Sequence, residues 1–412
     1  AGALPAGGAL LGFAMDMGST KLAAYLVDLR SGGTLASGGV MNPQIAYGED
    51  VVSRIAYANR GEEQRLALQT RLVDSANALL AELCQKAGAA PNQVVDAVVV
   101  GNTAMHHFFC GLPVAQLGAA PYVASVSQAL DIRADEVGLR LAPGARVHLP
   151  ANIAGYVGGD HTSALLTTQA YPMDHSLVLV DIGTNTEISL LHRGQIYTCS
   201  TASGPAFEGA HIKDGMRAAP GAVEAVHIRP DGGVSVGTIG RTAAVGICGS
   251  GILQGIAQMA ETGIIDARGV LDRAHPRVRS DRHKRAEFLL VPAAQTGHGR
   301  DIVITRRDVN EIQLAKGAIR AGIEVLLGKA GISAAQVDDW IIAGAFGTYL
   351  DLGSALRVGM FPGQPIERFH QVGNAAGVGA RQMLLSCRQR ERASQIIERV
   401  HYVELTIEPA FE

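Results

Sequence analysis

Residues 13–29 read FAMDMGSTKLAAYLVDL, and residues 177–194 read LVLVDIGTNTEISLLHRG. Each stretch is an apolar run, then Asp-x-Gly-Ser or Asp-x-Gly-Thr, then a second apolar run. Apolar alternation on both sides of a glycine predicts two antiparallel strands joined by a tight turn. Because strands and helices follow each copy in a similar order, we interpret the chain as a duplicated α/β domain with its break near Tyr171 and Pro172.

The composition is that of a large folded protein. The 412 residues predict two or three domains, and 47% of them are hydrophobic, which argues against disorder. The formal net charge is −3 and no Lys/Arg cluster stands out, so nucleic acid is not an expected partner. We interpret the charged run DRAHPRVRSDRHKRAEF (272–288) as part of a solvated surface insertion near 270–300.

The cysteines and the apolar runs indicate the kind of cellular compartment in which the protein works. No pair forms C-x-x-C, and no C-x₄-C-x₂-C motif of a plant-type iron–sulfur cluster occurs. A disulfide framework or zinc ribbon is therefore not expected, and a reducing cytoplasm fits better. No uncharged run reaches the roughly 18 residues of a membrane span, so no membrane contact is expected. The first residue is not Met, and we expect the chain to be a piece of something longer. The cysteines are Cys84, Cys110, Cys199, Cys248 and Cys387.

Both Asp-x-Gly turns carry groups that bind phosphate. Gly18 and Gly183 allow close approach of the backbone, and the Asp that opens each turn can hold hydrated Mg²⁺ or orient a water molecule. Two such turns facing each other would clamp a polyphosphate, whereas one copy alone is explained as well by an ordinary hairpin. The side chains that can donate to phosphate oxygens are Ser19, Thr20, Thr184 and Asn185.

Three further positions carry alternative interpretations. AGAFGTYLD (343–351) follows an apolar strand and suits contact with an adenine or ribose, although an ordinary strand-to-helix turn also explains it. Asp160, at a predicted loop-to-helix junction, is either a helix N-cap or a group that positions water or contacts magnesium. His106 and His107 are adjacent on a predicted helix and face different ways, so we interpret them as packed or interface residues rather than metal ligands.

The motifs together resemble a known superfamily. DMGST, DIGTNTE and AGAFG are similar to the phosphate-1, phosphate-2 and adenosine motifs of the sugar kinases, heat-shock chaperones and actin. Longer stretches, among them VVGNTAMHH, PANIAGYVGGD, SGPAFEGAHI, VGICGSGI, EIQLAKGAIRAGI and VGNAAGVGA, resemble the ATPase part of the reductive activators of corrinoid-dependent methyltransferases. The resemblance runs from about residue 11 to about residue 379.

The resemblance implies a fold and an activity. The fold would be α/β, with two ribonuclease-H-like (actin-like) domains around an ATP cleft, at 11–172 and 173–412, after a flexible segment at 1–10. The activity would couple ATP binding and hydrolysis to reduction of an inactive Co(II) corrinoid protein to Co(I). The electron would come from an iron–sulfur domain that this sequence lacks, or from a separate electron donor. Dimers are common in the family, so a homodimer is a further option.

The resemblance also implies roles for individual residues. Asp16 and Asp181 would be catalytic and would hold Mg²⁺, with Asp160 as a third catalytic carboxylate. Gln313 and Lys316 match a position where chaperone relatives touch the nucleoside, although an exposed helix face explains them equally. Residues 249–251 would close one side of the cleft, although a tight packing turn explains them nearly as well. Glu208 is expected near the nucleotide or the partner. The implied ATP contacts are Gly18, Ser19, Thr20, Lys21, Gly183, Thr184, Asn185, Gly249, Ser250, Gly251, Gln313, Lys316, Gly344, Ala345, Phe346 and Gly347.

Three other functions are compatible with the same motifs. A small-molecule, sugar-like kinase would use Asp160 as a general base on a hydroxyl. An activator of the 2-hydroxyacyl-CoA dehydratase type would need paired cysteines for a shared cluster, and the cysteines here show no such pairing. An actin-like or chaperone-like nucleotide switch would have a shape change as its product.

Overall fold

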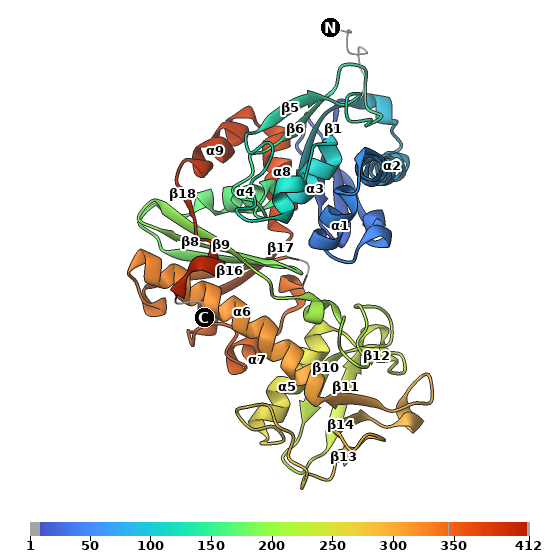
Figure 1. The fold of residues 1–412 in the computed structure, drawn as a ribbon. Helices are drawn as coiled ribbons and strands as arrows, with labels where there is room; N and C mark the ends of the chain where they lie inside the picture. Colours follow the sequence, from blue (N-terminus) through green and yellow to red (C-terminus); the bar gives the residue numbers. More distant parts are fainter. Residues whose placement is uncertain (1–8, 345, 410–412) are drawn as a thin grey trace. The chain divides into compact units, whose positions relative to one another are not determined.

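The computed structural model describes residues 9–344 and 346–409, which form two compact units (Figure 1). Unit 1 takes its described residues from Ala1–Asp174, Arg193–Ile196 and Asn374–Tyr402. Unit 2 takes its described residues from His175–His192, Tyr197–Gly373 and Val403–Glu412. The domain boundaries expected from the order of elements stay a prediction.

Unit 1 is built on a six-stranded sheet with the order β3-β2-β1-β4-β6-β5. The first hairpin is antiparallel, as the alternating sequence predicted, and β3 continues it. The strands β4 and β6 then run parallel to β1. The bounds are β1 (Leu11–Met17), β2 (Lys21–Asp28), β3 (Thr34–Met41), β4 (Val94–Gly101), β5 (Leu130–Arg133) and β6 (Arg146–Leu149).

Helices cover both faces of this sheet. Leu11, Phe13 and Met15 point into a core that includes the apolar face of α2, whereas a Cβ at Gly12 would meet Leu384 of α8. Since side chains alternate along a strand, the even-numbered residues of β1 face α8. The helices are α1 (Val51–Ala58), α2 (Glu62–Lys86), α3 (Thr103–Cys110), α4 (Gly159–Thr167), α8 (Ala375–Leu385) and α9 (Cys387–Ile397).

One sequence prediction about this unit is wrong. The glycines of VGNAAGVGA (372–380) predict a glycine-rich turn before a closing helix, but its residues from Ala375 onward are the first turns of α8. The small residues let α8 cross α4 closely, because a Cβ at Gly379 would overlap the carbonyl oxygen of Ser163. Ser163 Oγ also donates to the Ala376 carbonyl at 2.7 Å. The glycine therefore serves helix packing, not a turn.

Unit 2 repeats the pattern of the first sheet. Its strand order is β17-β16-β7-β8-β9, with β18 at the edge, and the hairpin of β7 and β8 is antiparallel while β16 and β17 continue the sheet in parallel. The long helix α6 (Arg306–Ala330) packs on β8 and β9. The strands are β7 (Leu177–Ile182), β8 (Thr186–His192), β9 (Gln195–Thr201), β16 (Asp339–Ala343), β17 (Phe369–Gly373) and β18 (Val400–Tyr402).

The rest of unit 2 consists of two small sheets and two shorter helices. The sheets have the orders β11-β10-β12 and β13-β14-β15, and α5 packs on β10. The elements are β10 (Ala222–Ile228), β11 (Val234–Thr238), β12 (Gly246–Ile247), α5 (Gly249–Glu261), β13 (Val278–Ser280), β14 (Ala286–Val291), β15 (Ile302–Thr305) and α7 (Leu352–Arg357).

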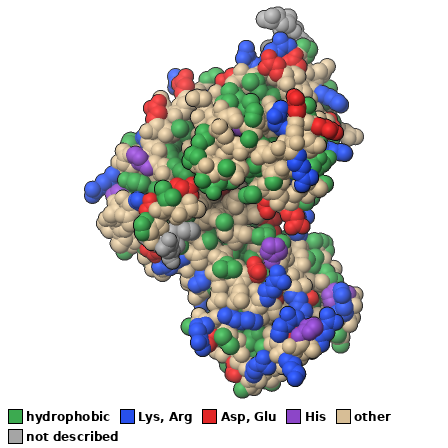
Figure 2. Space-filling model, viewed as in Figure 1, with side chains coloured by type: hydrophobic (Ala, Val, Ile, Leu, Met, Phe, Trp, Pro, Cys, Tyr) green, Lys and Arg blue, Asp and Glu red, His purple; other side chains and the backbone are tan. Residues whose placement is uncertain are grey.

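Lys and Arg side chains gather over the small sheets of unit 2 (Figure 2). Several form an ion pair with an aspartate a few residues away in sequence. Among the described helices, none is both long enough and apolar enough to cross a membrane. The paired side chains include Arg229–Asp231, Arg268–Asp266 and Arg285–Asp281.

Candidate functional site

The turn between β1 and β2 is held by a buried asparagine. Asn42 Nδ2 donates to the Gly18 carbonyl at 2.9 Å, and the Asn42 backbone N–H donates to the Thr20 carbonyl at 3.0 Å. Its Oδ1 accepts from the backbone of Gln44 at 3.0 Å, so all the polar atoms of the amide are used. The carbonyls of the turn are thus fixed from one side, while residues 18–20 stay partly exposed.

Lys21 starts β2 immediately after this turn. Its side chain extends over β3, since a Cβ at Gly39 would come within 2.7 Å of Lys21 Cε. A larger residue at position 39 would displace the lysine. The predicted role of Lys21 in offsetting phosphate charge stays a prediction.

Asp16 lies on the face of β1 that α8 covers. Its Oδ2 accepts from Asn374 Nδ2 at 2.8 Å. Burial raises the pKa of Asp16 to about 6, and the bond from Asn374 acts in the opposite direction. A carboxylate that is costly to ionise is stabilised by a cation at close range, so the position fits a magnesium ligand.

Asp160 occupies the first turn of α4. The N-cap residue of this helix is Gly158, so the alternative that Asp160 is the N-cap is wrong. Its Oδ1 accepts from the His161 backbone at 2.7 Å, and a carboxylate here also interacts favourably with the helix dipole. Asp16 and Asp160 therefore lie on elements that both pack against α8. A catalytic role for Asp160 stays a prediction.

The turn between β7 and β8 is braced by the segment that follows β9. Thr184 Oγ1 donates to Glu208 Oε1 at 2.5 Å, and the Gly204 backbone N–H donates to the Thr184 carbonyl at 3.0 Å. Glu208 ends the 3₁₀ helix η5 (Pro205–Glu208). Gly183 is exposed and Asn185 is partly exposed. Asp181 lies opposite Glu187 in the strand pair.

Other predicted positions of unit 2 gather beside this turn. Gly344 has a positive φ of 92°, and a Cβ there would come within 2.8 Å of Asp181 Oδ1. Phe346 stacks on Phe207 with ring centroids 4.8 Å apart. A Cβ at Gly249 would overlap the Phe207 carbonyl. The adenosine-like motif, the start of α5 and the second Asp-x-Gly turn are thus neighbours, and Ala345 lies outside the described residues.

Glycines 249 and 251 have a clear packing reason. A Cβ at Gly251 would overlap the Val223 carbonyl oxygen, just as one at Gly249 would overlap that of Phe207. Ser250 Oγ lies 3.3 Å from Cys248 Sγ. Gly347 starts the 3₁₀ helix η9 (Gly347–Tyr349), and its carbonyl accepts from Gln371 Nε2 at 2.6 Å. Contacts of these residues with a nucleotide stay predictions.

Gln313 and Lys316 contact other segments. Arg306 donates to Gln313 Oε1 at 3.3 Å, and a Cβ at Gly269 would lie 2.9 Å from Gln313 Nε2. Lys316 Nζ is 3.7 Å from the Cβ position of Gly359. Gln313 therefore lies against the loop after α5, and Lys316 lies beside the segment after α7.

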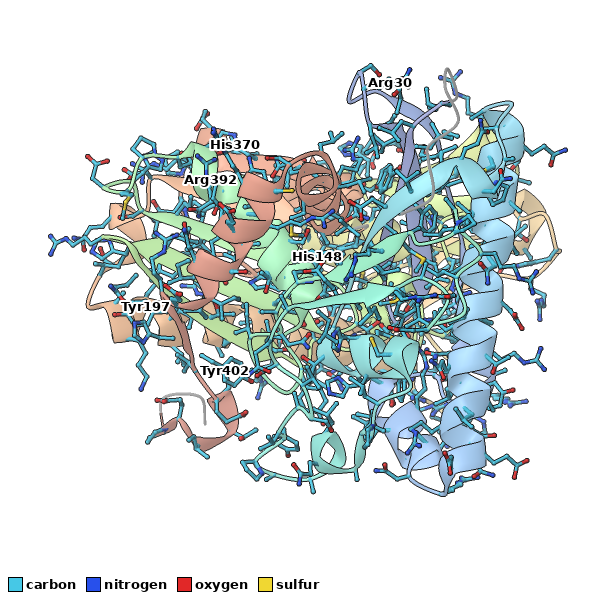
Figure 3. All side chains as sticks on the ribbon, turned by 90° about the horizontal axis from the view of Figure 1, so that it is seen from above. Arg30, His148, Tyr197, His370, Arg392 and Tyr402 are labelled. Carbon is cyan, nitrogen blue, oxygen red and sulfur yellow. The ribbon has the colours of Figure 1, made fainter. Side chains whose placement is uncertain are left out.

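The histidines near the first turn are packed. His106 and His107 are buried, with Nδ1 atoms 3.3 Å apart, and burial lowers the pKa of His106 to about 3. His148 of β6 (Figure 3) bonds Asp131 at 3.0 Å. In the described part of the chain, no three His, Cys, Asp or Glu side chains are grouped so as to hold a metal ion. The expectation of packed histidines is confirmed.

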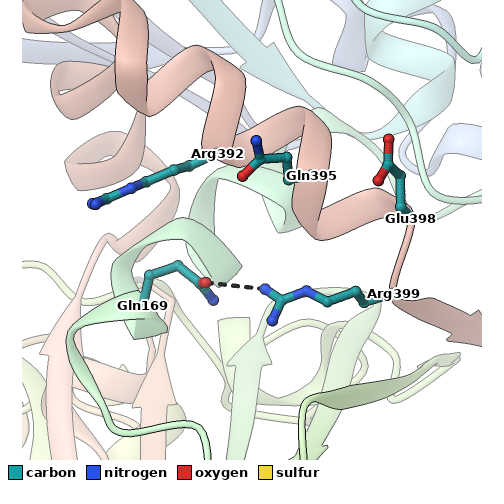
Figure 4. Close-up of a pocket in the computed structure, with 5 residues that line it drawn as sticks. All are labelled: Gln169, Arg392, Gln395, Glu398 and Arg399. Atoms are coloured by element: carbon teal, nitrogen blue, oxygen red, sulfur yellow. Dashed lines mark hydrogen bonds between the residues drawn. The ribbon is translucent and has the colours of Figure 1, made fainter.

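A cavity of about 420 Å³ opens in unit 1. Arg399 donates to Gln169 at 3.0 Å across it (Figure 4). None of the residues predicted to bind a ligand lines it. The lining residues are Gln169, Arg392, Gln395, Glu398 and Arg399.

Two residues that hold the first turn escaped the sequence analysis. Neither Asn42 nor Asn374 is among the site residues predicted from the sequence. A signal existed for Asn374, because an asparagine before a run of small residues is typical of a helix N-cap. No local signal relates either asparagine to the turn that it contacts, since both contacts are distant in sequence.

Two family models match the chain. The RACo middle region matches residues 11–173. The C-terminal domain of RACo, the ASKHA domain, matches residues 175–412, which is more than half of the chain. ASKHA denotes the superfamily of sugar kinases, chaperones and actin, so the predicted α/β, actin-like fold class is confirmed.

Individual relatives agree with these models. The chain is 35% identical over 415 residues to the corrinoid activation enzyme RamQ of Eubacterium limosum, across 98% of this chain and 69% of that protein. It is 29% identical over 272 residues to the Co(II) methylated amine-specific corrinoid protein reductase of Methanosarcina barkeri, across 61% of this chain and 46% of that protein.

A solved structure is also similar over nearly the whole chain. It is a reductive activator for corrinoid, iron–sulfur protein, with 37% identity and a TM-score of 0.87. The match covers 98% of this chain and 64% of that chain. The present chain therefore spans about two thirds of the solved relative.

Proposed function

This chain belongs to the RACo family of reductive activators of corrinoid proteins, and from that premise we propose that it is the ATPase module of such an activator. The observation that carries the proposal is the paired construction of the two Asp-x-Gly turns. Each turn joins the first hairpin of its sheet, and each is held by bonds to its carbonyls or hydroxyl. In each turn the glycine and the donors beside it stay accessible to a phosphate.

The residues of the first turn have distinct roles in this proposal. The backbone N–H groups and hydroxyls of residues 18–20 donate to phosphate oxygens, and Lys21 offsets phosphate charge. Asp16 and Asp181 are the carboxylates that would provide oxygen ligands for Mg²⁺. Bound Mg²⁺ neutralises the charge of the phosphates. Asp160 orients the attacking water.

The second turn and its neighbours bind the rest of the nucleotide. The backbone N–H groups of Gly183, Thr184 and Asn185 and the Asn185 side chain donate to phosphate oxygens, whereas the Thr184 hydroxyl donates to Glu208. The segment from Gly344 to Gly347 lies against the nucleoside. The proximity of Gly344 and Asp181 supports this assignment, because the residues that bind a phosphate group and those that bind the attached nucleoside must lie close together. Gln313, Lys316 and residues 249–251 remain proposed contacts.

The proposed reaction couples two balanced changes. ATP and water give ADP and phosphate, and one electron passes from a reduced iron–sulfur group to Co(II) of a corrinoid protein, which becomes Co(I). The iron–sulfur group belongs to a domain or a donor protein outside the present sequence, because the sequence lacks a C-x₄-C-x₂-C motif. The Methanosarcina barkeri relative is named as a reductase of a Co(II) corrinoid protein, which supports Co(II) as the oxidised substrate.

The decisive experiment supplies a corrinoid protein in the Co(II) state, a reduced iron–sulfur donor and the full-length activator. The absorption spectrum of the cobalt is followed with ATP, with a non-hydrolysable analogue and without nucleotide. We expect Co(I) to accumulate only when ATP is present and hydrolysed. ATP consumption that depends on a sugar or polyol, with no change at cobalt, would instead identify a kinase.

A further inference from the structure

We propose that Asn374 is a positioning residue that fixes the Asp16 carboxylate in the orientation that receives the magnesium–nucleotide complex. The proposal rests on the nucleotide function proposed above and adds a residue to it. It also connects that carboxylate to α8. The argument depends on contacts within unit 1.

The first step is that both ends of the Asn374 amide are in use. Nδ2 donates to Asp16 Oδ2 at 2.8 Å, and Oδ1 accepts from the Gly377 backbone at 2.6 Å. The second bond makes Asn374 the N-cap of α8. The amide therefore cannot rotate without losing one of the two bonds, and its donor is aimed at the carboxylate by the helix itself.

The second step is that the bond leaves one carboxylate oxygen available. Of the residues that the structure describes, none donates a hydrogen bond to Asp16 Oδ1. A magnesium ion needs a single oxygen from such a carboxylate, together with water and phosphate oxygens. Asn374 thus occupies one oxygen and presents the other.

The third step concerns the groups around the pair. Tyr25 of β2 lies beside Asn374, since a Cβ at Gly377 would be 2.9 Å from the Tyr25 hydroxyl oxygen. Arg381, one helical turn farther along α8, lies over the Tyr25 ring at 4.8 Å and donates to Thr34 Oγ1 at 3.1 Å. Arg381 therefore contacts the Tyr25 ring and the Thr34 hydroxyl, and the group that donates a hydrogen bond to Asp16 is the neutral amide of Asn374.

The fourth step links this contact to α4. The first turn of α8 accepts a bond from Ser163 of α4 through the Ala376 carbonyl, at 2.7 Å. Asn374 and Ala376 are two residues apart, so a displacement of α8 against the sheet changes the Asp16 contact and the α4 contact together. Asp160 lies on α4, so it is held in place by the same contact between α4 and α8.

The test compares two substitutions of Asn374 in the full-length protein. Asn374→Ser keeps a good N-cap but is too short to reach Asp16, and Asn374→Asp keeps the cap but replaces the donor with a second carboxylate. We expect the magnesium concentration for half-maximal ATPase activity to rise about tenfold in Asn374→Ser and more in Asn374→Asp. The KM for ATP at saturating magnesium should change less than twofold.

The matched control is Asn77→Ser. Asn77 also donates one buried bond and accepts another, to Gly138 and from Arg140, but does so on α2. A magnesium dependence of Asn374→Ser equal to that of Asn77→Ser would overturn the proposal. In the Asp16→Asn background, Asn374→Ser should have no further effect on magnesium dependence, because the two residues act as one unit. Additive effects would also overturn the proposal.

A second readout does not require turnover. A non-hydrolysable ATP analogue raises the unfolding temperature, and the increment that magnesium adds should be lost in Asn374→Ser while the magnesium-free increment remains. Loss of both increments would mean a structural role and would overturn the proposal. Failure of the wild-type protein to form Co(I), with the magnesium increment present and sensitive to Asn374, would reject the proposed function alone.

Discussion

At the scale of single residues, Asp16 shows how a candidate site costs stability. Its pKa in the folded protein is about 6, above the ordinary value of 3.8, because burial disfavours the charged form. The folded state therefore holds a proton that the unfolded state releases, so stability falls as pH rises from about 4 to about 6. A shift of about two units corresponds to ~3 kcal/mol once pH exceeds 6.

Replacement of Asp16 by Asn should remove this cost. At pH 8, without nucleotide, we expect the free energy of unfolding of Asp16→Asn to exceed that of the wild type by up to ~3 kcal/mol. At pH 4 the two proteins should be nearly equal, because the wild-type carboxyl is protonated in most folded molecules. Urea unfolding at both pH values measures the difference. An increase in the free energy of unfolding that is the same at pH 4 and pH 8 would contradict a raised pKa of Asp16 as its cause.

Glu208 is a second residue whose role as a hydrogen-bond acceptor can be tested separately from its charge. It accepts the bond from Thr184, so Glu208→Ala should remove this brace from the second turn and raise the KM for ATP by about tenfold, since a bond to a charged group is worth ~1.5 kcal/mol. Glu208→Gln retains an acceptor and should stay within about threefold of wild type. Glu224→Ala, on the exposed face of β10, is the control. Equal effects of Glu208→Ala and Glu224→Ala would refute the role.

At the scale of elements, the sequence was informative where a pattern is local. The alternating residues around Gly18 and Gly183 predicted both hairpins. The stretch at 373–379 misled because glycine is typical of turns, whereas here it allows two helices to cross. The Asn374–Asp16 contact joins residues 358 positions apart, so no local pattern could predict it.

Two glycines of α6 allow a test, on one helix, of whether a glycine is needed for close packing. A Cβ at Gly322 would come within 2.7 Å of Thr201 Cγ2 and 2.9 Å of Ile188 Cδ1, while one at Gly317 would meet nothing within 4 Å. We expect Gly322→Ala to lower the free energy of unfolding by about 1–3 kcal/mol through overpacking. Gly317→Ala should raise it by ~0.5–1 kcal/mol through helix propensity. Chemical denaturation of both variants checks the opposite signs, and two gains would show that this helix face is loosely packed.

At the scale of the whole molecule, each compact unit is assembled from separate stretches of the chain. Unit 1 needs residues 374–402, because α8 covers the face of β1 and β4 opposite to α2. The sequence duplication pointed to two halves split near residue 172, but duplication does not reveal that the last helices pack with the first half. That information lies in long-range contacts such as Gly12 with Leu384.

A fragment experiment tests this assembly. Residues 9–174 alone should expose the apolar face under α8 and show no cooperative unfolding transition. The same fragment joined by a flexible linker to residues 374–402 should regain one. Circular dichroism during thermal unfolding distinguishes the two. A cooperative transition in the shorter fragment would show that α8 is dispensable for the fold of unit 1.

The interleaved chain path also imposes an order on biosynthesis. A ribosome makes β1 and its Asp-x-Gly turn long before it makes α8, and most of unit 2 is translated in the interval. During that time the nascent sheet carries Gly12, Ala14 and Asp16 without the helix that covers them. The contact between Asn374 and Asp16 can therefore form only after nearly all of this sequence has left the exit tunnel. Under the proposed function, nucleotide would bind after the first unit has folded and would not act as a template for its folding.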